Sequence, residues 1–168
     1  MGALDYFTIE NFLEKEFFDS FKKICFSSDI DWHFNKNMTK NDDYFFSHCF
    51  IKDHVIRSTL YIDFIVPILK KLNSSAVSEA RANLMLKKEK LYQSTFHCDR
   101  PFDCRTAILY MNTCNGYTML DEEKKIKINC EENKILIFNS KIKHAAFSQT
   151  DEERRIVINF NYFENKIN

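Results

Sequence analysis

Two side chains that can bind a metal ion stand one residue apart in the segment FHCDRPFDCRTAILYMN, residues 96–112. They are His97 and Asp99, and the segment after them becomes apolar and typical of a strand. Alternate residues of a strand project to the same face, so His97 and Asp99 are expected to point together while Cys98 faces away. An imidazole and a carboxylate on one edge can hold a metal ion or form a hydrogen-bonded structural pair, and the two residues alone leave both interpretations open.

A third candidate ligand, His144, lies much further along the chain. It is one of five histidines and follows KILIFNSKIK, a buried-type strand with a short polar turn. Two histidines and one carboxylate form the facial triad that binds Fe(II) and leaves three coordination positions open. None of the six cysteines forms a Cys-x-x-Cys pair, so a zinc ribbon is not expected. His97, Asp99 and His144 are therefore predicted to be the metal ligands and the catalytic centre.

Two arginines follow His144 at the start of the strand-like run RRIVINFNY. An arginine there can clamp a carboxylate with two hydrogen bonds, and the ordinary alternative is a solvated strand end. Adjacent strand residues face opposite sides, so Arg154 and Arg155 cannot both reach one ligand. A dicarboxylate whose 2-oxo acid end chelates the metal needs such a clamp at its far end.

The length and composition are those of one domain with a sizeable core. The chain has 168 residues, of which 45% are hydrophobic, and its formal net charge is +0. No stretch approaches the roughly 20 apolar residues that cross a membrane, and no basic excess supports nucleic-acid binding. The N-terminus lacks the pattern of a secretory signal. We expect a cytoplasmic protein with reduced cysteines and no membrane partner, and the sequence leaves the oligomeric state open.

Two helices are expected before residue 75. The segment NFLEKEFFDSFKKI has apolar residues at helical spacing, with Asn11 as its N-cap. The segment STLYIDFIVPILKKL reads as a second helix, with Ser58 as its N-cap and a kink or break at Pro67. Between them, Asp31 to His48 has no clean period, and we expect a long loop with short strand pieces. Such a loop either covers a site or is a surface excursion.

From Ser75 onward the chain changes to about seven or eight short segments rich in β-branched and aromatic residues. The dipeptide Asn115-Gly116 predicts a tight hairpin turn. Because no helices alternate with these strands, a parallel α/β sheet is disfavoured. The expected fold is mainly β, a sandwich or jelly roll with the N-terminal helices packed on one sheet.

Four segments, FHCD, TAILYMNTCNGYT, KILIFNSKIKHAAF and RRIVINFNY, resemble the 2-oxoglutarate- and Fe(II)-dependent oxygenases. They look most like the small prolyl-4-hydroxylase-like members of phages and bacteria. IENFLEKEFF, FFSHCF and ARANLML also resemble that group, so the resemblance covers essentially the whole chain. It implies a single domain over 1–168 with a double-stranded β-helix (jelly roll, cupin-like). Residues 1–74 would form a helical part with a covering loop, and 75–168 the jelly-roll core.

The resemblance also implies roles for single residues. The three predicted metal ligands match the iron ligands of the family. Arg155 matches the residue that pairs with the distal carboxylate of 2-oxoglutarate, because it begins an R-x-x-x-N pattern that runs to Asn159, and Arg154 is the runner-up. Tyr110 matches a tyrosine whose hydroxyl bonds the same carboxylate. Asn159 matches a polar position on the face of Arg155.

Several residues have two interpretations each. Relatives often carry Tyr where this sequence has Met85, and Tyr92 or a water is the candidate replacement. In the expected covering loop, Trp32 or Tyr44 is predicted to lie nearest the substrate, and the alternative is that these aromatics dock the N-terminal helix onto the core. His48 is either a structural histidine or a group near the substrate.

The resemblance implies an enzyme that uses Fe(II), the cosubstrate 2-oxoglutarate and O₂, with ascorbate as a stimulant, to hydroxylate an unactivated C–H bond with release of succinate and CO₂. The expected substrate is a peptidyl proline or a free amino acid. A nucleobase or another small molecule is an alternative, although the neutral net charge argues mildly against a polyanion. A rival of another class is a non-catalytic jelly-roll structural or assembly protein with a vestigial metal site.

Overall fold

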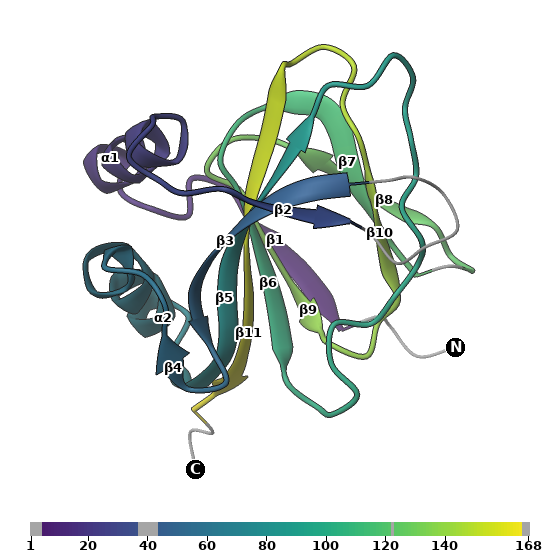
Figure 1. Cartoon of the computed structure of the whole chain (residues 1–168). Helices are drawn as coiled ribbons and strands as arrows, with labels where there is room; N and C mark the ends of the chain where they lie inside the picture. Colours follow the sequence, from purple (N-terminus) through teal and green to yellow (C-terminus); the bar gives the residue numbers. More distant parts are fainter. Residues whose placement is uncertain (1–4, 37–43, 122, 166–168) are drawn as a thin grey trace.

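The strands form two antiparallel sheets that face each other in a computed structural model that describes residues 5–36, 44–121 and 123–165 (Figure 1). The elements are β1 (Tyr6–Ile9), α1 (Lys15–Cys25), β2 (His33–Lys36), β3 (Tyr44–Lys52), β4 (Val55–Ile56), a π-helical segment (Tyr61–Ile65), α2 (Val66–Lys71), β5 (Ser74–Leu86), β6 (Arg105–Tyr110), β7 (Cys114–Leu120), β8 (Ile126–Cys130), β9 (Ile135–Asn139), β10 (His144–Phe147) and β11 (Arg154–Glu164). The larger sheet has the order β1-β9-β6-β11-β5-β3-β2, with β4 on β3, and the smaller one the order β10-β7-β8. This is a jelly roll, so the expected fold class is confirmed.

Side-chain alternation along the central strands gives the larger sheet two different faces. In β11, Ile156, Ile158 and Phe160 are buried in the core cluster on the side of the helices. Val157, between them, belongs to a second cluster that fills the space between the two sheets. The same period of two operates in β5, where alternate residues pack toward the helices. The side chains on the other face of these two strands are therefore turned toward the smaller sheet, and they include Arg81, Asn83 and Met85 of β5 and Arg155, Val157 and Asn159 of β11.

Both expected helices pack on one face of the larger sheet, where α1 and α2 lie side by side on its outer side (Figure 1). Phe21 of α1 stacks on Phe64 of the π-helical segment, with ring centroids 4.7 Å apart. The expected N-cap is wrong, because α1 begins at Lys15 and Asn11 has a φ of 49°. The amide after Asn11 donates to the Asn133 carbonyl at 2.8 Å, so this stretch is attached to a distant turn rather than capping the helix.

The second helix is irregular, as Pro67 predicted. A π-helical segment covers Tyr61–Ile65, and α-helical geometry starts only at Val66. Proline has no backbone N–H. At the second position of α2 this costs no hydrogen bond, because the first amides of an α-helix have no partner within the helix. Ser58 lies before the helix, where its Oγ accepts a hydrogen bond from the Leu60 amide at 3.2 Å.

The segment expected to be a long loop contains two paired strands. β2 pairs with β3, and β3 continues the larger sheet by pairing with β5, with Phe46 opposite Leu84. Aromatic residues on both faces of β3 hide its period in the sequence, because Phe45 faces a cavity while Phe46 packs on the core. Residues 37–43, the middle of the expected loop, lie outside the described residues.

Asn115-Gly116 lies inside β7 and not at a hairpin turn, so this expectation is wrong. Gly116 has no positive φ, and a Cβ there would stand 2.9 Å from the Phe147 carbonyl oxygen and 3.0 Å from Cδ of Arg155. The glycine therefore permits a close approach of backbone and arginine rather than a turn.

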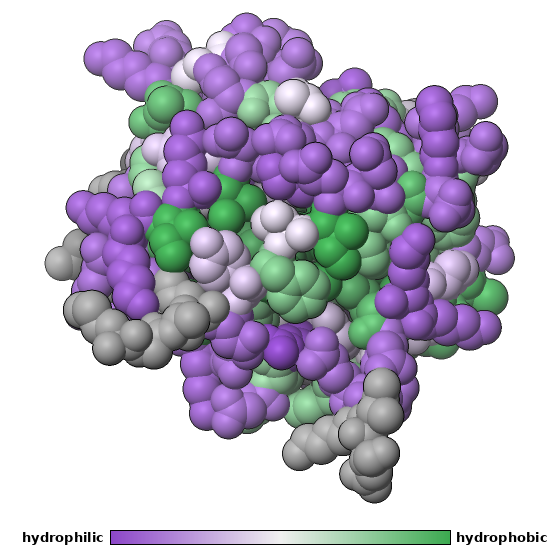
Figure 2. All heavy atoms as spheres, turned by 180° about the vertical axis from the view of Figure 1, so that it is seen from behind, coloured by the Kyte–Doolittle hydropathy of each residue, from purple (hydrophilic) through white to green (hydrophobic). Residues whose placement is uncertain are grey.

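In the described part of the chain, no helix is long and apolar enough to cross a membrane. The face seen from behind is mostly hydrophilic, with separate hydrophobic areas near its middle (Figure 2).

Candidate metal centre and adjoining cavity

His97, Asp99 and His144 come together in the structure. Their ligand-type atoms all lie within 4.8 Å of one another. Nε2 of each histidine is 3.6 Å from Oδ1 of Asp99, and the two imidazole centroids are 4.5 Å apart. The sequence-predicted ligand set is thus one cluster of two imidazoles and one carboxylate.

The two histidines are held side by side by backbone hydrogen bonds and not by a shared strand. The amide of His97 donates to the carbonyl of His144 at 3.0 Å, and the reverse bond is 2.9 Å. His97 otherwise lies in irregular chain, and β6 starts only at Arg105. The strand expected to carry His97 and Asp99 is therefore wrong, since an isolated bridge across the chain aligns the histidines and Asp99 reaches them from the following bend.

The Nδ1 atom of each imidazole forms a hydrogen bond that orients the ring. Nδ1 of His97 bonds the Thr95 carbonyl at 3.1 Å, and Nδ1 of His144 bonds the Ile142 carbonyl at 3.4 Å. A carbonyl oxygen only accepts, so Nδ1 carries the proton in both bonds, and in the neutral imidazole Nε2 is the nitrogen available to a metal ion. Such bonds fix the tautomer and ring orientation of metal-binding histidines.

Asp99 is held by one of its oxygens. Oδ2 accepts hydrogen bonds from Thr106 Oγ1 at 3.1 Å and from Asn161 Nδ2 at 3.0 Å. Arg100 donates from Nε to Oδ1 of Asn161 at 3.2 Å and pairs with Glu79 at 2.5 Å. Sequence reasoning missed Thr106 and Asn161. Asn161 could have been found, because it lies two residues beyond Asn159 on the same face of β11.

The charges of the cluster suit a divalent cation. Burial opposes ionisation of Asp99, but the hydrogen bond with His97 and the charge of His144 hold the pKa of this carboxyl well below its usual range. The hydrogen bond with Asp99 raises the pKa of His97, and burial lowers the pKa of His144. An ion with bonds of about 2 Å holds neighbouring ligands about 3 Å apart. The three side chains fit such an ion after a small rotation. Cys98, which lies between His97 and Asp99 in the sequence, is directed elsewhere, because its thiol donates to the Lys141 carbonyl at 3.1 Å.

A cavity of about 440 Å³ adjoins the cluster and is lined by both histidines. Arg155 lies in its wall and is only 1% exposed. Nη1 of Arg155 stands 3.3 Å from the Met85 sulfur and Nη2 stands 3.4 Å from Thr118 Oγ1, while Nε has no partner. Among the described residues no carboxylate pairs with this guanidinium. A buried cation without a counter-charge is costly, so this wall suits an anionic ligand.

Tyr110 lies one layer behind the cavity. It is completely buried, and its hydroxyl donates to Thr118 Oγ1 at 2.9 Å. The guanidinium carbon of Arg155 is 5.8 Å from the Tyr110 ring centroid. Thr118, which sequence reasoning missed, therefore stands at the cavity surface where Tyr110 was expected. Its place two residues after Gly116 on the same face of β7 was the available signal.

Arg154 and Asn159 occupy different surroundings from Arg155. Arg154 faces α1, where Nη1 donates to the Phe26 carbonyl at 3.2 Å. Asn159 lines the cavity and is paired in register with Arg81 of β5. It therefore lies four residues, roughly 13 Å along the strand, from Arg155.

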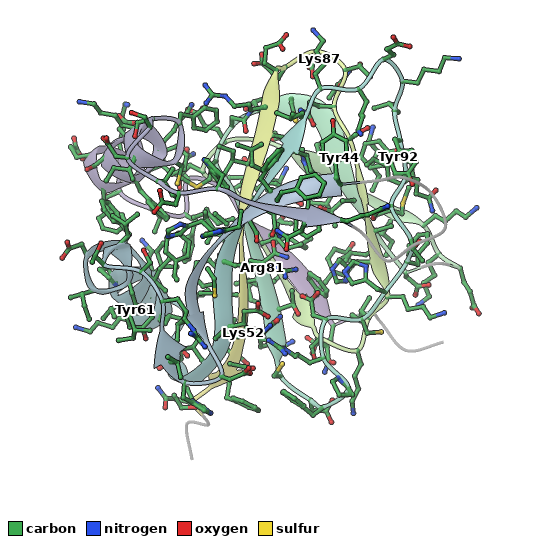
Figure 3. All side chains as sticks on the ribbon, viewed as in Figure 1. Tyr44, Lys52, Tyr61, Arg81, Lys87 and Tyr92 are labelled. Carbon is green, nitrogen blue, oxygen red and sulfur yellow. The ribbon has the colours of Figure 1, made fainter. Side chains whose placement is uncertain are left out.

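The aromatic residues of the N-terminal half divide between the cavity and the core. Tyr44 and Tyr92 both line the cavity, and Figure 3 labels them in the upper right part of the view. Trp32 packs against the core on the side of the helices. His48 has both ring nitrogens hydrogen-bonded, to a backbone carbonyl at 2.9 Å and to a serine hydroxyl at 2.8 Å, which fits the structural interpretation.

The sequence matches no protein-family model and no curated protein. Solved structures share its fold. A 2OG-Fe(II) oxygenase family oxidoreductase from Burkholderia pseudomallei has a TM-score of 0.73 at 7% identity over 95% of this chain and 85% of that chain. A Pseudomonas putida prolyl-4-hydroxylase has a TM-score of 0.69 at 12% identity over 97% and 94%. HygX from Streptomyces hygroscopicus, crystallised with nickel, 2-oxoglutarate and hygromycin B, has a TM-score of 0.63 at 11% identity over 98% and 84%. The chain thus has the fold of 2OG-Fe(II) oxygenases, and the phage and bacterial subgroup stays a prediction.

Proposed function

We propose that this chain is a 2-oxoglutarate- and Fe(II)-dependent dioxygenase with His97, Asp99 and His144 as its metal ligands. One observation carries the proposal: a cluster of two imidazoles and one carboxylate shares a cavity with the buried guanidinium of Arg155, which has no carboxylate partner among the described residues. A dicarboxylate that chelates a metal at one end supplies the missing counter-charge at its other end. The fold shared with solved oxygenases supports this interpretation.

Arg155 is proposed to bind the distal carboxylate of 2-oxoglutarate. Nε has no hydrogen-bond partner, and the guanidinium is otherwise surrounded by a thioether, a hydroxyl and the Cys130 thiol, with no carboxylate among the described residues. Tyr110 would act through Thr118, because the Tyr110 proton occupies Thr118 Oγ1 and leaves the threonine proton free for a carboxylate oxygen. Burial raises the pKa of Tyr110, so it stays a neutral donor. Asn159, which the family resemblance also made a contact of 2-oxoglutarate, lines the end of the cavity away from Arg155.

Fe(II), when bound, would supply the O₂ activation that hydroxylation of an unactivated C–H bond requires. One oxygen atom enters the substrate, and the other enters succinate as 2-oxoglutarate loses CO₂. The chain contributes orientation: Thr106 and Asn161 hold one oxygen of Asp99, and backbone carbonyls hold both imidazoles. We propose a peptidyl proline or a free amino acid as substrate, in line with the prolyl-4-hydroxylase among the structural neighbours.

The test is metal-dependent turnover without substrate. Protein stripped with a chelator and reloaded with Fe(II) is expected to convert 2-oxoglutarate to succinate slowly, and His144→Ala is expected to lose this conversion. His54→Ala, which changes an exposed histidine, serves as the matched control. A wild-type protein that neither binds 2-oxoglutarate when metal-loaded nor forms succinate would favour the non-catalytic jelly-roll alternative.

A further inference from the structure

The cavity has a second cationic residue at the end away from Arg155. Arg81 projects from β5 and lines both the large cavity and a smaller adjoining one, together with His97 and Asn159. Figure 3 labels it near the centre of the molecule. Its side chain is 35% exposed, and its guanidinium lies 5.8 Å from the Phe45 ring centroid. Arg81 therefore presents a positioned positive charge beside the metal cluster.

The charge of Arg81 is only weakly balanced by the protein. Its ion pair is with Glu79 at 3.8 Å, and the other oxygen of Glu79 is held by Arg100 at 2.5 Å. The described residues that line the large cavity include Arg81, Lys88 and Arg155 but no aspartate or glutamate. The smaller cavity also carries Glu79, which is held by Arg100, and Asp99, which belongs to the metal cluster. On the side of the large cavity, the charge of Arg81 therefore still favours an anionic group after one dicarboxylate has bound at Arg155.

Two hydrogen-bond acceptors stand next to Arg81 and lack donors. Oδ1 of Asn83 and Oδ1 of Asn159 are buried, line the large cavity and have no hydrogen-bond partner. Asn159 is the direct register partner of Arg81, and Asn83 lies two residues along β5 on the same face. Cross-strand neighbours of this kind have Cβ atoms about 5 Å apart. The site thus places a cationic donor group beside acceptors that need an N–H.

We propose that the substrate is a free amino acid, whose carboxylate pairs with Arg81 and whose amino group donates to Asn83 and Asn159. This inference rests on the proposed dioxygenase function. An amino acid carries an anion and a cationic donor on one carbon, which matches the adjacent guanidinium and amide oxygens. A residue inside a peptide has a neutral amide on each side, so it would leave Arg81 without an anion.

Binding can be measured without turnover on Zn(II)-loaded protein saturated with 2-oxoglutarate. The ligands for calorimetric titration are the twenty common amino acids and their carboxamides. At least one amino acid is expected to bind, and its carboxamide should bind at least about tenfold more weakly, a difference of about 1.4 kcal/mol. Arg81→Met should weaken that acid by roughly 10- to 100-fold and leave 2-oxoglutarate affinity unchanged. Arg57→Met, at an exposed arginine, should change neither affinity.

Turnover gives the second readout. With Fe(II), the acid that binds should gain one oxygen by mass spectrometry, and Arg81→Met should lose this product while uncoupled succinate formation persists. Three outcomes would overturn the proposal: no amino acid binds although 2-oxoglutarate does, the carboxamide binds as well as the acid, or Arg81→Met binds like the wild type. Failure of the dioxygenase function itself is distinct, because then 2-oxoglutarate neither binds nor is converted to succinate.

Discussion

The two oxygens of Asp99 have different surroundings, and this division prepares the carboxylate for a metal ion. Oδ2 accepts from Thr106 and Asn161, while Oδ1 faces both histidines. A carboxylate held in this way loses little rotational freedom when Oδ1 binds an ion. Groups that orient metal ligands typically contribute 10- to 100-fold in metal affinity.

Removing the hydrogen bond from Asn161 is therefore expected to weaken metal binding. Asn161→Ala should lower the affinity for Co(II) by about 10- to 100-fold, as followed by the visible absorption of the bound ion or by calorimetry. Asn129→Ala, on the exposed face of β8, is the control and should bind Co(II) like the wild type. An unchanged affinity in Asn161→Ala would mean that Thr106 alone orients Asp99.

The two neighbouring arginines provide a second test at this scale, because they differ in burial and direction. Arg155→Ala should raise the dissociation constant of 2-oxoglutarate by about 10- to 100-fold, since a charge-assisted hydrogen bond contributes about 1.5–3 kcal/mol. Arg154→Ala should change it little, because this side chain bonds a carbonyl of the segment after α1. Titration of Zn(II)-loaded protein measures both constants. The reverse ranking would contradict the assignment of Arg155.

Among the elements, the β2–β3 pair gives the larger sheet an edge that reaches over the cavity. Tyr44 begins β3 and lines the cavity, and the Phe34, Tyr44 and Phe46 rings contact one another across the pair. Trp32, just before β2, instead packs against the core beneath the helices. The two aromatics that the sequence placed together in one covering loop therefore have different neighbours.

Substitutions of Trp32 and Tyr44 should have different effects on the stability of the fold and on the coupling of 2-oxoglutarate turnover to substrate hydroxylation. Trp32→Ala is expected to lower the free energy of unfolding by roughly 1–3 kcal/mol, because it removes packing from the core. Tyr44→Ala should change stability by about 0.5 kcal/mol or less, while hydroxylation of a substrate falls and uncoupled succinate formation persists. Urea denaturation and product analysis measure the two effects. A large loss of stability with normal coupling in Tyr44→Ala would rule out its role at the cavity.

In the whole molecule, the three proposed metal ligands join segments that are far apart in the chain. His144 belongs to β10 of the smaller sheet, and Asp99 is hydrogen-bonded to β6 and β11 of the larger one. The ligand set exists only when the two sheets face each other. An ion that binds this set therefore binds the folded state and stabilises it by mass action.

Metal should therefore raise the melting temperature. At a concentration of 100 times the dissociation constant the gain is about 2.7 kcal/mol, or roughly 5–10 °C for a chain of this size. Differential scanning calorimetry with and without Zn(II) or Mn(II) measures the shift, and His144→Ala should abolish it. His54→Ala should keep the full shift. An equal shift in both variants would place the stabilising ion elsewhere.

The sequence by itself determined the properties that depend on residue type and on local period. The spacing and chemistry of His97, Asp99 and His144 predicted the cluster that the structure brings together. Alternation predicted that Arg154 and Arg155 face opposite sides, and the strand pattern after Ser75 predicted the jelly roll. The inferences on Arg154, Arg155 and the fold succeed because the period of a strand is a property of a few neighbouring residues, whereas the ligand cluster was predicted by residue type although His97 and Asp99 lie outside regular strands.

Only the tertiary structure decided which distant segments meet. It aligned the two histidines by a bridge outside any regular strand, placed Thr118 in front of Tyr110, and put Gly116 inside β7 beneath Arg155. It also paired Arg81 with Asn159 across β5 and β11. Each contact depends on the register between strands that are far apart in the chain. The local hydrophobic pattern fixes which face of a strand a residue occupies, but its partner on a distant strand is decided only when the core packs.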